Sequence, residues 1–112
     1  MSSINDKTMR IRDLNDTFRR TLTGGRLLIT VGVSAMGPAH VAALLNKLRE
    51  FEQFDEANDP YGEHDFGALD HDDKTFLWKI DYYAPSLESA SADPTDPLQT
   101  VRVLTLMLAQ EY

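Results

Sequence analysis

Three consecutive ionisable residues, Glu63, His64 and Asp65, lie in the most polar stretch of the chain, and a second such group follows at 70–72. Carboxylates and imidazoles bind zinc, iron or manganese and transfer protons in catalysis. In a regular strand, however, neighbouring side chains point to opposite faces, so Glu63 and His64 cannot easily share one ion. The chain has no HExxH, EF-hand or nucleophile-elbow motif. We therefore expect no metal, no cofactor and no enzymatic activity. The alternative is a small hydrolase or metal-binding protein that uses this region.

Charge is distributed unevenly along the chain, whose 112 residues carry a formal net charge of −7. Residues 1–26 contain six Lys or Arg and three Asp, whereas residues 50–73 contain ten Asp or Glu and no Lys or Arg. Direct binding of nucleic acid needs basic side chains on phosphates, so the acidic block argues against it. The block is either a solvated face or an electrostatic surface for a basic partner.

If the block binds a partner, its carboxylates would supply the charge and nearby tyrosines the aromatic anchors. Nucleic-acid-binding proteins are the commonest basic proteins, so we expect one of these as partner. We expect no direct binding to nucleic acid and no association with a membrane. A homodimer is also compatible with the sequence. The candidate partner-binding residues are Asp55, Glu56, Asp59, Tyr61, Glu63, Asp70, Asp72, Asp73 and Tyr83.

Apolar periodicity indicates how these residues are positioned. Ile11, Leu14, Phe18 and Leu22 recur every three or four residues and predict a helix over 6–22, which the two following glycines end. The run RLLITVGV at 26–33 predicts a buried strand. A second helix is expected to begin at Pro38, a residue suited to the first helical turn, and to end near residue 54.

Residues 63–70 and 74–83 flank His71-Asp72-Asp73 and predict a β-hairpin. In its second strand every other residue should face the core, namely Phe76, Trp78, Ile80 and Tyr82. That places Tyr83 on the opposite face, as the most exposed aromatic residue of this cluster. His40 and the other histidines lie in no catalytic motif, and His40 is expected to face solvent.

The end of the chain is ambiguous. Leu98, Val101, Leu104, Thr105 and Leu108 recur at helical spacing and predict a helix, although the alternation in VRVLTLML also suits a strand. We expect one small α+β domain over residues 1–112, in the order α-β-α-β-β-α. A three-stranded sheet would contain the hairpin, with helices packed mainly on one face. Residues 1–6 are expected to be disordered, and 84–96 to form a mobile loop.

Composition also bears on the compartment. The absence of cysteine excludes disulfides, thiolate metal sites and a cysteine nucleophile. No apolar run approaches the ~18 residues of a membrane-spanning helix, and the N-terminus lacks the apolar stretch of a signal peptide. We expect a cytoplasmic protein.

Several stretches are distinctive: GGRLLITVGV, NDPYGEHDFG, WKIDYY and RVLTLMLAQEY. With these stretches the chain, from about residue 9 to 112, resembles a small bacterial family of unknown function. This family occurs mainly in alphaproteobacteria and often on plasmids and prophages. The resemblance implies a stand-alone intracellular domain of mobile-element origin and assigns no role to any residue. Combined with the acidic block, it suggests a counter-defence inhibitor, that is, an anti-CRISPR or anti-restriction protein that mimics nucleic acid.

Overall fold

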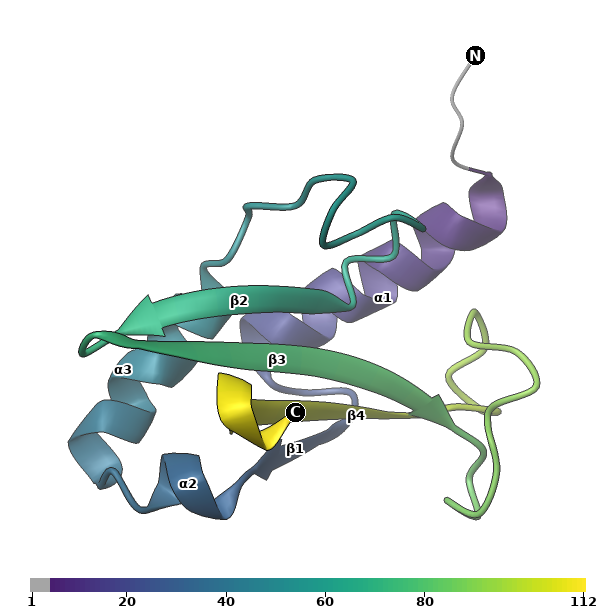
Figure 1. Cartoon of the computed structure of the whole chain (residues 1–112). Coiled ribbons are helices and arrows are strands. Elements are labelled where there is room, and N and C mark those ends of the chain that lie inside the picture. Colours follow the sequence, from purple (N-terminus) through teal and green to yellow (C-terminus); the bar gives the residue numbers. More distant parts are fainter. Residues whose placement is uncertain (1–4) are drawn as a thin grey trace.

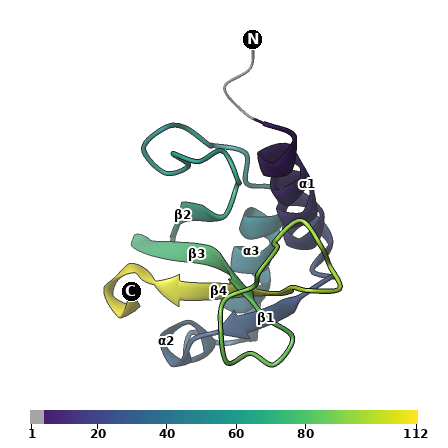
Figure 2. The same cartoon turned by 90° about the vertical axis from the view of Figure 1, so that its right-hand side faces the viewer.

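The computed structural model describes residues 5–112, which form a four-stranded sheet with two long helices on one of its faces (Figures 1 and 2). The strands lie in the order β1-β4-β3-β2; β1 is parallel to β4, and the other two pairs are antiparallel. The elements are α1 (Asp6–Thr21), β1 (Arg26–Ile29), α2 (Val31–Ser34), α3 (Pro38–Arg49), β2 (Phe66–His71), β3 (Lys74–Tyr83), β4 (Val101–Leu108) and a 3-10 helix, Ala109–Glu111.

Helix α1 follows the predicted pattern closely. The side chain of Asn5 caps its first turn by accepting a hydrogen bond from the Thr8 amide at 2.8 Å. Ile11 and Phe18 are buried on its inner face. The helix ends at Leu22, whose left-handed backbone (φ 58°) lets its amide bond the Phe18 carbonyl. Of the residues expected to be disordered, Asn5 and Asp6 thus belong to this helix start, and 1–4 lie outside the described residues.

The C-terminal segment is a strand, so the predicted helix over 98–108 is wrong. β4 pairs with β1 on one side and β3 on the other, which makes it a central strand of a sheet of four rather than three. Leu104 and Leu106 are buried beneath the helices, while Val103 and Met107 are buried on the opposite face. A strand that is buried on both faces has a nearly continuous apolar sequence, and such a run also satisfies helical spacing.

The first strand is shorter than predicted. β1 ends at Ile29, and the residues after it turn into the short helix α2. This turn is held by Glu111, whose carboxylate accepts hydrogen bonds from the Thr30 hydroxyl (2.6 Å) and the Gly32 amide (3.1 Å). The segment 30–33 therefore contacts the chain's C-terminal turn instead of extending the sheet. The helix that was predicted to begin at Pro38 is α3, and it ends at Arg49, earlier than the expected residue 54.

The predicted hairpin is confirmed. β2 and β3 are joined by Asp72 and Asp73, both with left-handed φ (53° and 60°), as a two-residue type I′ turn requires. Phe76, Trp78 and Ile80 of β3 face the helices and are buried.

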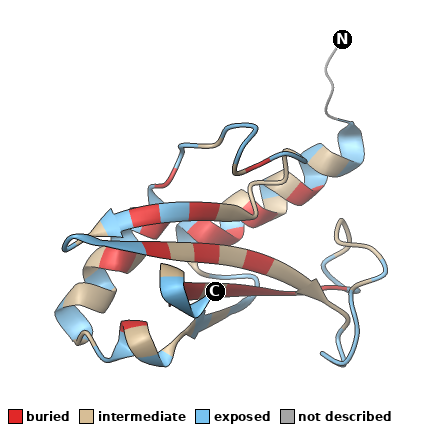
Figure 3. Cartoon of the chain, in the orientation of Figure 1, coloured by how far each residue is buried: buried red, intermediate tan, exposed pale blue. Residues whose placement is uncertain are grey.

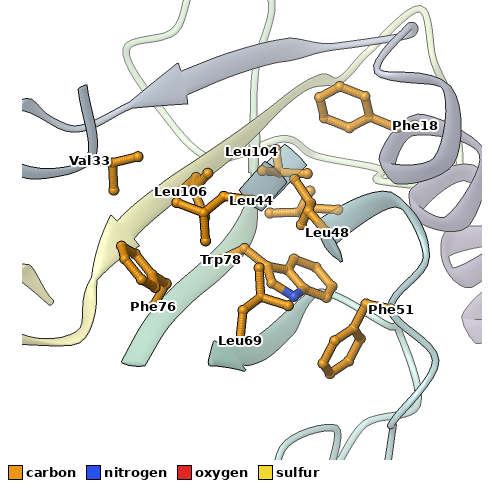
Figure 4. Packing of buried hydrophobic residues seen from close by; sticks show 11 residues of the cluster. Phe18, Val33, Leu44, Leu48, Phe51, Leu69, Phe76, Trp78, Leu104 and Leu106 are labelled. Atoms are coloured by element: carbon orange, nitrogen blue, oxygen red, sulfur yellow. The ribbon is translucent and has the colours of Figure 1, made fainter. Parts of the chain in front are cut away.

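The core lies between the sheet and helices α1 and α3 (Figures 3 and 4). Trp78 is fully buried at its centre, and Phe51, just after α3, meets it edge-on at 5.5 Å. Neither α1 nor α3 crosses the other face of the sheet, where the short C-terminal 3-10 helix lies near β3 (Figures 1 and 2). Residues 84–100 form an irregular segment; its mobility stays a prediction. None of the helices within residues 5–112 has the length and apolar character needed to cross a membrane.

At Gly67 the core has no room for a larger side chain. A Cβ there would lie 2.5 Å from Nε1 of Trp78 and 2.7 Å from Cζ of Phe51. Both rings are held by their neighbours, so Gly67→Ala should lower the free energy of unfolding by about 1–3 kcal/mol. Urea denaturation measures this, with Ala68→Ser on the exposed side of the same strand as the control. Equal midpoints for Gly67→Ala and the wild type would contradict this account of the packing.

Candidate functional site

The acidic block folds into the end of α3, the loop 50–65 and the β2–β3 hairpin. The loop is held by its own polar residues: the Asp55 carboxylate accepts hydrogen bonds from the amides of Ala57 and Asn58. The Asn58 side chain in turn accepts from the Asp55 amide and donates to the Gln53 carbonyl. These Asx-type contacts explain why a polar segment without helix or strand holds one conformation.

His64 is fixed between two carboxylates. Its backbone is left-handed (φ 56°), and its amide donates to Oδ1 of the buried Asp59 at 3.0 Å. Nδ1–H donates to Asp16 of α1 at 2.9 Å, and the ring stacks on Phe54 at 3.8 Å between centroids. The other ring nitrogen, Nε2, faces Asp59 Oδ2 at 3.6 Å.

This arrangement orients an imidazole as a catalytic dyad would, but Nε2 faces a carboxylate where a dyad would present it to a nucleophile. The structure pairs His64 with Asp16 and Asp59, which are distant in the sequence, rather than with the adjacent Asp65. Within residues 5–112, no three His, Asp or Glu side chains lie close enough together to hold a metal ion. The metal alternative thus has no cluster of ligands among the described residues, and the hydrolase alternative stays a prediction.

Glu63 belongs to a second, satisfied network. Tyr82 donates its hydroxyl to Glu63 Oε1 at 2.8 Å and accepts from Nδ2 of Asn15 at 2.7 Å. The Asn15 side chain also donates to the Glu63 carbonyl and accepts from Nε of Arg102. Burial raises the pKa of Tyr82 and lowers the pKa of Arg102. Both Glu63 and Asp59 thus serve the interior of the fold rather than a free surface.

Arg19 ties this region to α3. Its guanidinium is fully buried and donates to the carbonyls of Leu48 and Arg49 at the end of α3, both at 3.2 Å. It also pairs with Asp16 at 3.1 Å. Desolvation lowers the pKa of Arg19, and the hydrogen bond to Asp16 opposes that shift.

Asp65 is half-buried, and the other seven carboxylates of the block are exposed, on β2, on its hairpin turn and on the loop that precedes it. Asp70, Asp72 and Asp73 surround the hairpin turn, and Asp55 and Glu56 lie on the loop that leads into the other end of the strand. Between them, Glu50 and Glu52 line a groove that also contains Ala68 and Asp70. We call this surface the acidic edge; it comprises Glu50, Glu52, Asp55, Glu56, Asp70, Asp72 and Asp73.

The two candidate aromatic anchors are separated. Tyr61 is 79% exposed and lies in the loop near Asp55 and Glu56. Tyr83 is half-buried on the face of the sheet opposite α1 and α3, beside Leu87 and Val103. Of the predicted residues, the structure therefore brings Asp55, Glu56 and Tyr61 together at one end of β2 and the three hairpin aspartates at the other, and it leaves Tyr83 apart.

Sequence reasoning missed one cluster. His40 and His71 contact each other through Nδ1 and Nε2 at 3.0 Å, and Lys47 Nζ lies 3.2 Å from His71 Nδ1 and 2.7 Å from the Asp70 carbonyl. Because an ammonium only donates, His71 Nδ1 accepts, and its Nε2–H donates to His40. His40 is thus half-buried rather than solvent-facing. His40 and Lys47 are seven residues apart on one helix, and only the fold brings His71 to them.

Comparison with known proteins gives one match. The family model described as "Protein of unknown function (DUF3768)" matches residues 29–111. No curated protein and no solved structure matches the chain. The matched residues include α2, α3 and strands β2 to β4, while α1, which carries Asn15 and Arg19, precedes them. The expected family of unknown function is thereby confirmed, and its distribution among bacteria and mobile elements stays a prediction.

Removal of Arg19 should be strongly destabilising. Arg19→Met leaves the carbonyls of Leu48 and Arg49 without this donor and Asp16 without its buried cation, at a cost of about 3 kcal/mol or more. Arg20→Met, at the exposed neighbouring position, is the matched control and should change stability by less than about 0.5 kcal/mol. Urea denaturation of both variants measures the difference. Similar losses in the free energy of unfolding would contradict a stabilising role for the buried Arg19 guanidinium.

Asp65 should make stability depend on pH. Burial, followed by the nearby Glu63 charge, raises its pKa from 3.8 to about 6. Between these values the unfolded chain loses this proton and the folded chain retains it, so stability falls as pH rises from about 4 to about 6. Asp65→Asn should therefore melt at a higher temperature than the wild type at pH 7 and at the same temperature near pH 4. For Asp73→Asn, in the exposed turn, the difference in melting temperature from the wild type should be the same at both pH values. A melting-temperature difference that is the same at both pH values would contradict the assignment.

Proposed function

Because the chain belongs to the DUF3768 family of proteins of unknown function, we propose a function from its own surface: it binds a basic protein partner through the acidic edge. The observation that carries this proposal is that the exposed carboxylates are not neutralised. Within residues 5–112, the ion pairs involve Asp16, Asp59 and Asp81, and none involves a member of the acidic edge.

Two lysines, Lys47 and Lys74, lie beside three aspartates at the hairpin end of the acidic edge, so they offset only part of its charge. Lys47 donates to the Asp70 carbonyl and lies against His71, and Lys74 follows the turn. Seven carboxylates on one side of a small domain attract positively charged partners and speed their encounter. The inward carboxylates, Asp59 and Glu63, are occupied by His64 and Tyr82, so they fix the loop that presents the exposed ones.

The narrower proposal is that the partner is a nucleic-acid-binding protein whose groove the acidic edge fills. β2 has six residues and is therefore about 20 Å long. Asp70 lies in this strand, and the other members of the acidic edge lie beside it or beyond its two ends. These carboxylates would take the place of the phosphates that such a groove binds. An anti-CRISPR or anti-restriction role would be one case of such inhibition.

The test compares two variants that lose the same charge. One carries Asp70→Asn, Asp72→Asn and Asp73→Asn in the acidic edge; the control carries Asp6→Asn, Asp13→Asn and Glu88→Gln, all at exposed positions elsewhere. Each immobilised protein is incubated with nuclease-treated host lysate. The control should capture the same partner as the wild type, and the acidic-edge variant should retain about tenfold less, because three exposed ion pairs are lost.

The captured partner is then purified, and its binding to single-stranded nucleic acid is measured with and without this protein. Binding to the protein should weaken as NaCl rises from about 0.05 to 0.3 M, where screening shortens the reach of exposed charges. Equal capture by both variants, without dependence on salt, would mean that the acidic edge is only a solvated face. A partner that binds nucleic acid equally well in the presence of the protein would overturn the narrower proposal.

A further inference from the structure

We propose that the partner's basic segment binds in an extended conformation and adds to β2 as a fifth strand of the sheet. This inference rests on the proposed function and specifies how the partner is recognised. Its basis is the backbone of β2, together with the groove beside it that contains Glu50 and Glu52.

β2 is an edge strand whose outer backbone groups follow from its register. The two-residue turn makes His71 and Lys74 a hydrogen-bonded pair, and the pairing alternates from there, so Leu69 and Gly67 also bond to β3. The Asp65 carbonyl, which accepts from the Ile80 amide at 2.8 Å, agrees with this alternation. The amides and carbonyls of Phe66, Ala68 and Asp70 therefore point away from the sheet.

These outward groups differ in availability. The Asp70 carbonyl accepts a hydrogen bond from Lys47 at 2.7 Å. At Ala68 both the amide and the carbonyl point outward, and its small side chain is exposed. An incoming strand can form two hydrogen bonds there without displacing a side chain, which is the geometry of β-strand addition. Lys47 marks the end of the accessible stretch, as lysines on natural edge strands do.

The alternation of side chains determines what such a strand should carry. Residues opposite Gly67 and Leu69 would point to the helical side, into the groove lined by Phe51, Glu50 and Glu52, with Lys47 at its Asp70 end. The residue opposite Ala68 would point to the other face, beside Phe66. Lys or Arg at every second position would therefore meet the two glutamates, with small or β-branched residues between them.

Two alternative arrangements fit the charges less well. A second copy of this chain pairing through the same edge would place Glu50, Glu52 and Asp70 of both copies in one interface, which brings like charges close together. The opposite edge, β1, has only four residues and begins with Arg26. A basic strand therefore fits the β2 edge better than the β1 edge.

The probe is a capped hexapeptide, acetyl-Lys-Thr-Lys-Val-Lys-Thr-amide, titrated into the ¹⁵N-labelled full chain. We expect amide exchange at Ala68 to slow at least tenfold at saturation, because its N–H becomes hydrogen-bonded. A peptide of the same composition in blocks, Lys-Lys-Lys-Thr-Val-Thr, should bind more weakly. The double variant Glu50→Gln, Glu52→Gln should weaken binding of the alternating peptide about two- to thirtyfold, whereas Asp6→Asn, Asp13→Asn should leave it unchanged.

Two results would overturn the inference: unchanged exchange at Ala68, or equal affinity for the two peptides. If the glutamate variant still weakens binding of both peptides in that case, the acidic edge binds basic segments without strand addition, and the proposed function stands. If neither peptide binds and the lysate capture is also unaffected by the acidic-edge substitutions, both proposals fail.

Discussion

The burial of one cation organises this fold. Arg19 has no exposed surface, and a buried charge is stabilised only where neighbouring groups supply an opposite charge and hydrogen-bond acceptors; its Nε alone has no partner in the described part of the chain. Asp16 supplies the opposite charge, the end of α3 supplies two carbonyls, and the rings of Phe54 and Trp78 lie 5.4 and 5.6 Å away. Because Asp16 also bonds His64, a single buried group connects α1, α3, the acidic loop and the centre of the sheet.

The same cost of burying charge divides the acidic block into two classes. Carboxylates that turn inward have acquired donors: Asp59 accepts from His64, and Glu63 accepts from Tyr82. Asp65 is half-buried among other carboxylates, and its raised pKa reflects the lack of such compensation. The rest of the block faces solvent, since residues 50–73 contain no Lys or Arg to pair with. The inward class builds the loop, and the outward class defines the surface that is open to a partner.

β2 is an edge strand of the sheet, and the acidic edge lies beside it. An edge strand exposes hydrogen-bonding groups that promote aggregation with other copies, and natural proteins protect such edges with charged residues. Here the charge has one sign over most of the edge, which would disfavour pairing between copies of this chain and, on our proposal, attract a basic strand. The same residues would then serve both purposes, with Lys47 limiting the length of strand that remains accessible.

The sequence by itself determined the features set by local periodicity and by charge. These include α1, the start of α3, the hairpin with its Asp72-Asp73 turn and the core face of β3. The concentration of carboxylates was also evident from the sequence. Only the tertiary structure decided that VRVLTLML is a central strand, because burial on both faces removes the alternation that distinguishes strand from helix. It also decided which carboxylates are available: the donors that occupy Asp59 and Glu63, and the carbonyls that fix Arg19, come from residues distant in the chain. Sequence spacing carries no record of such contacts, because they form only when the packed elements bring these groups within hydrogen-bonding distance.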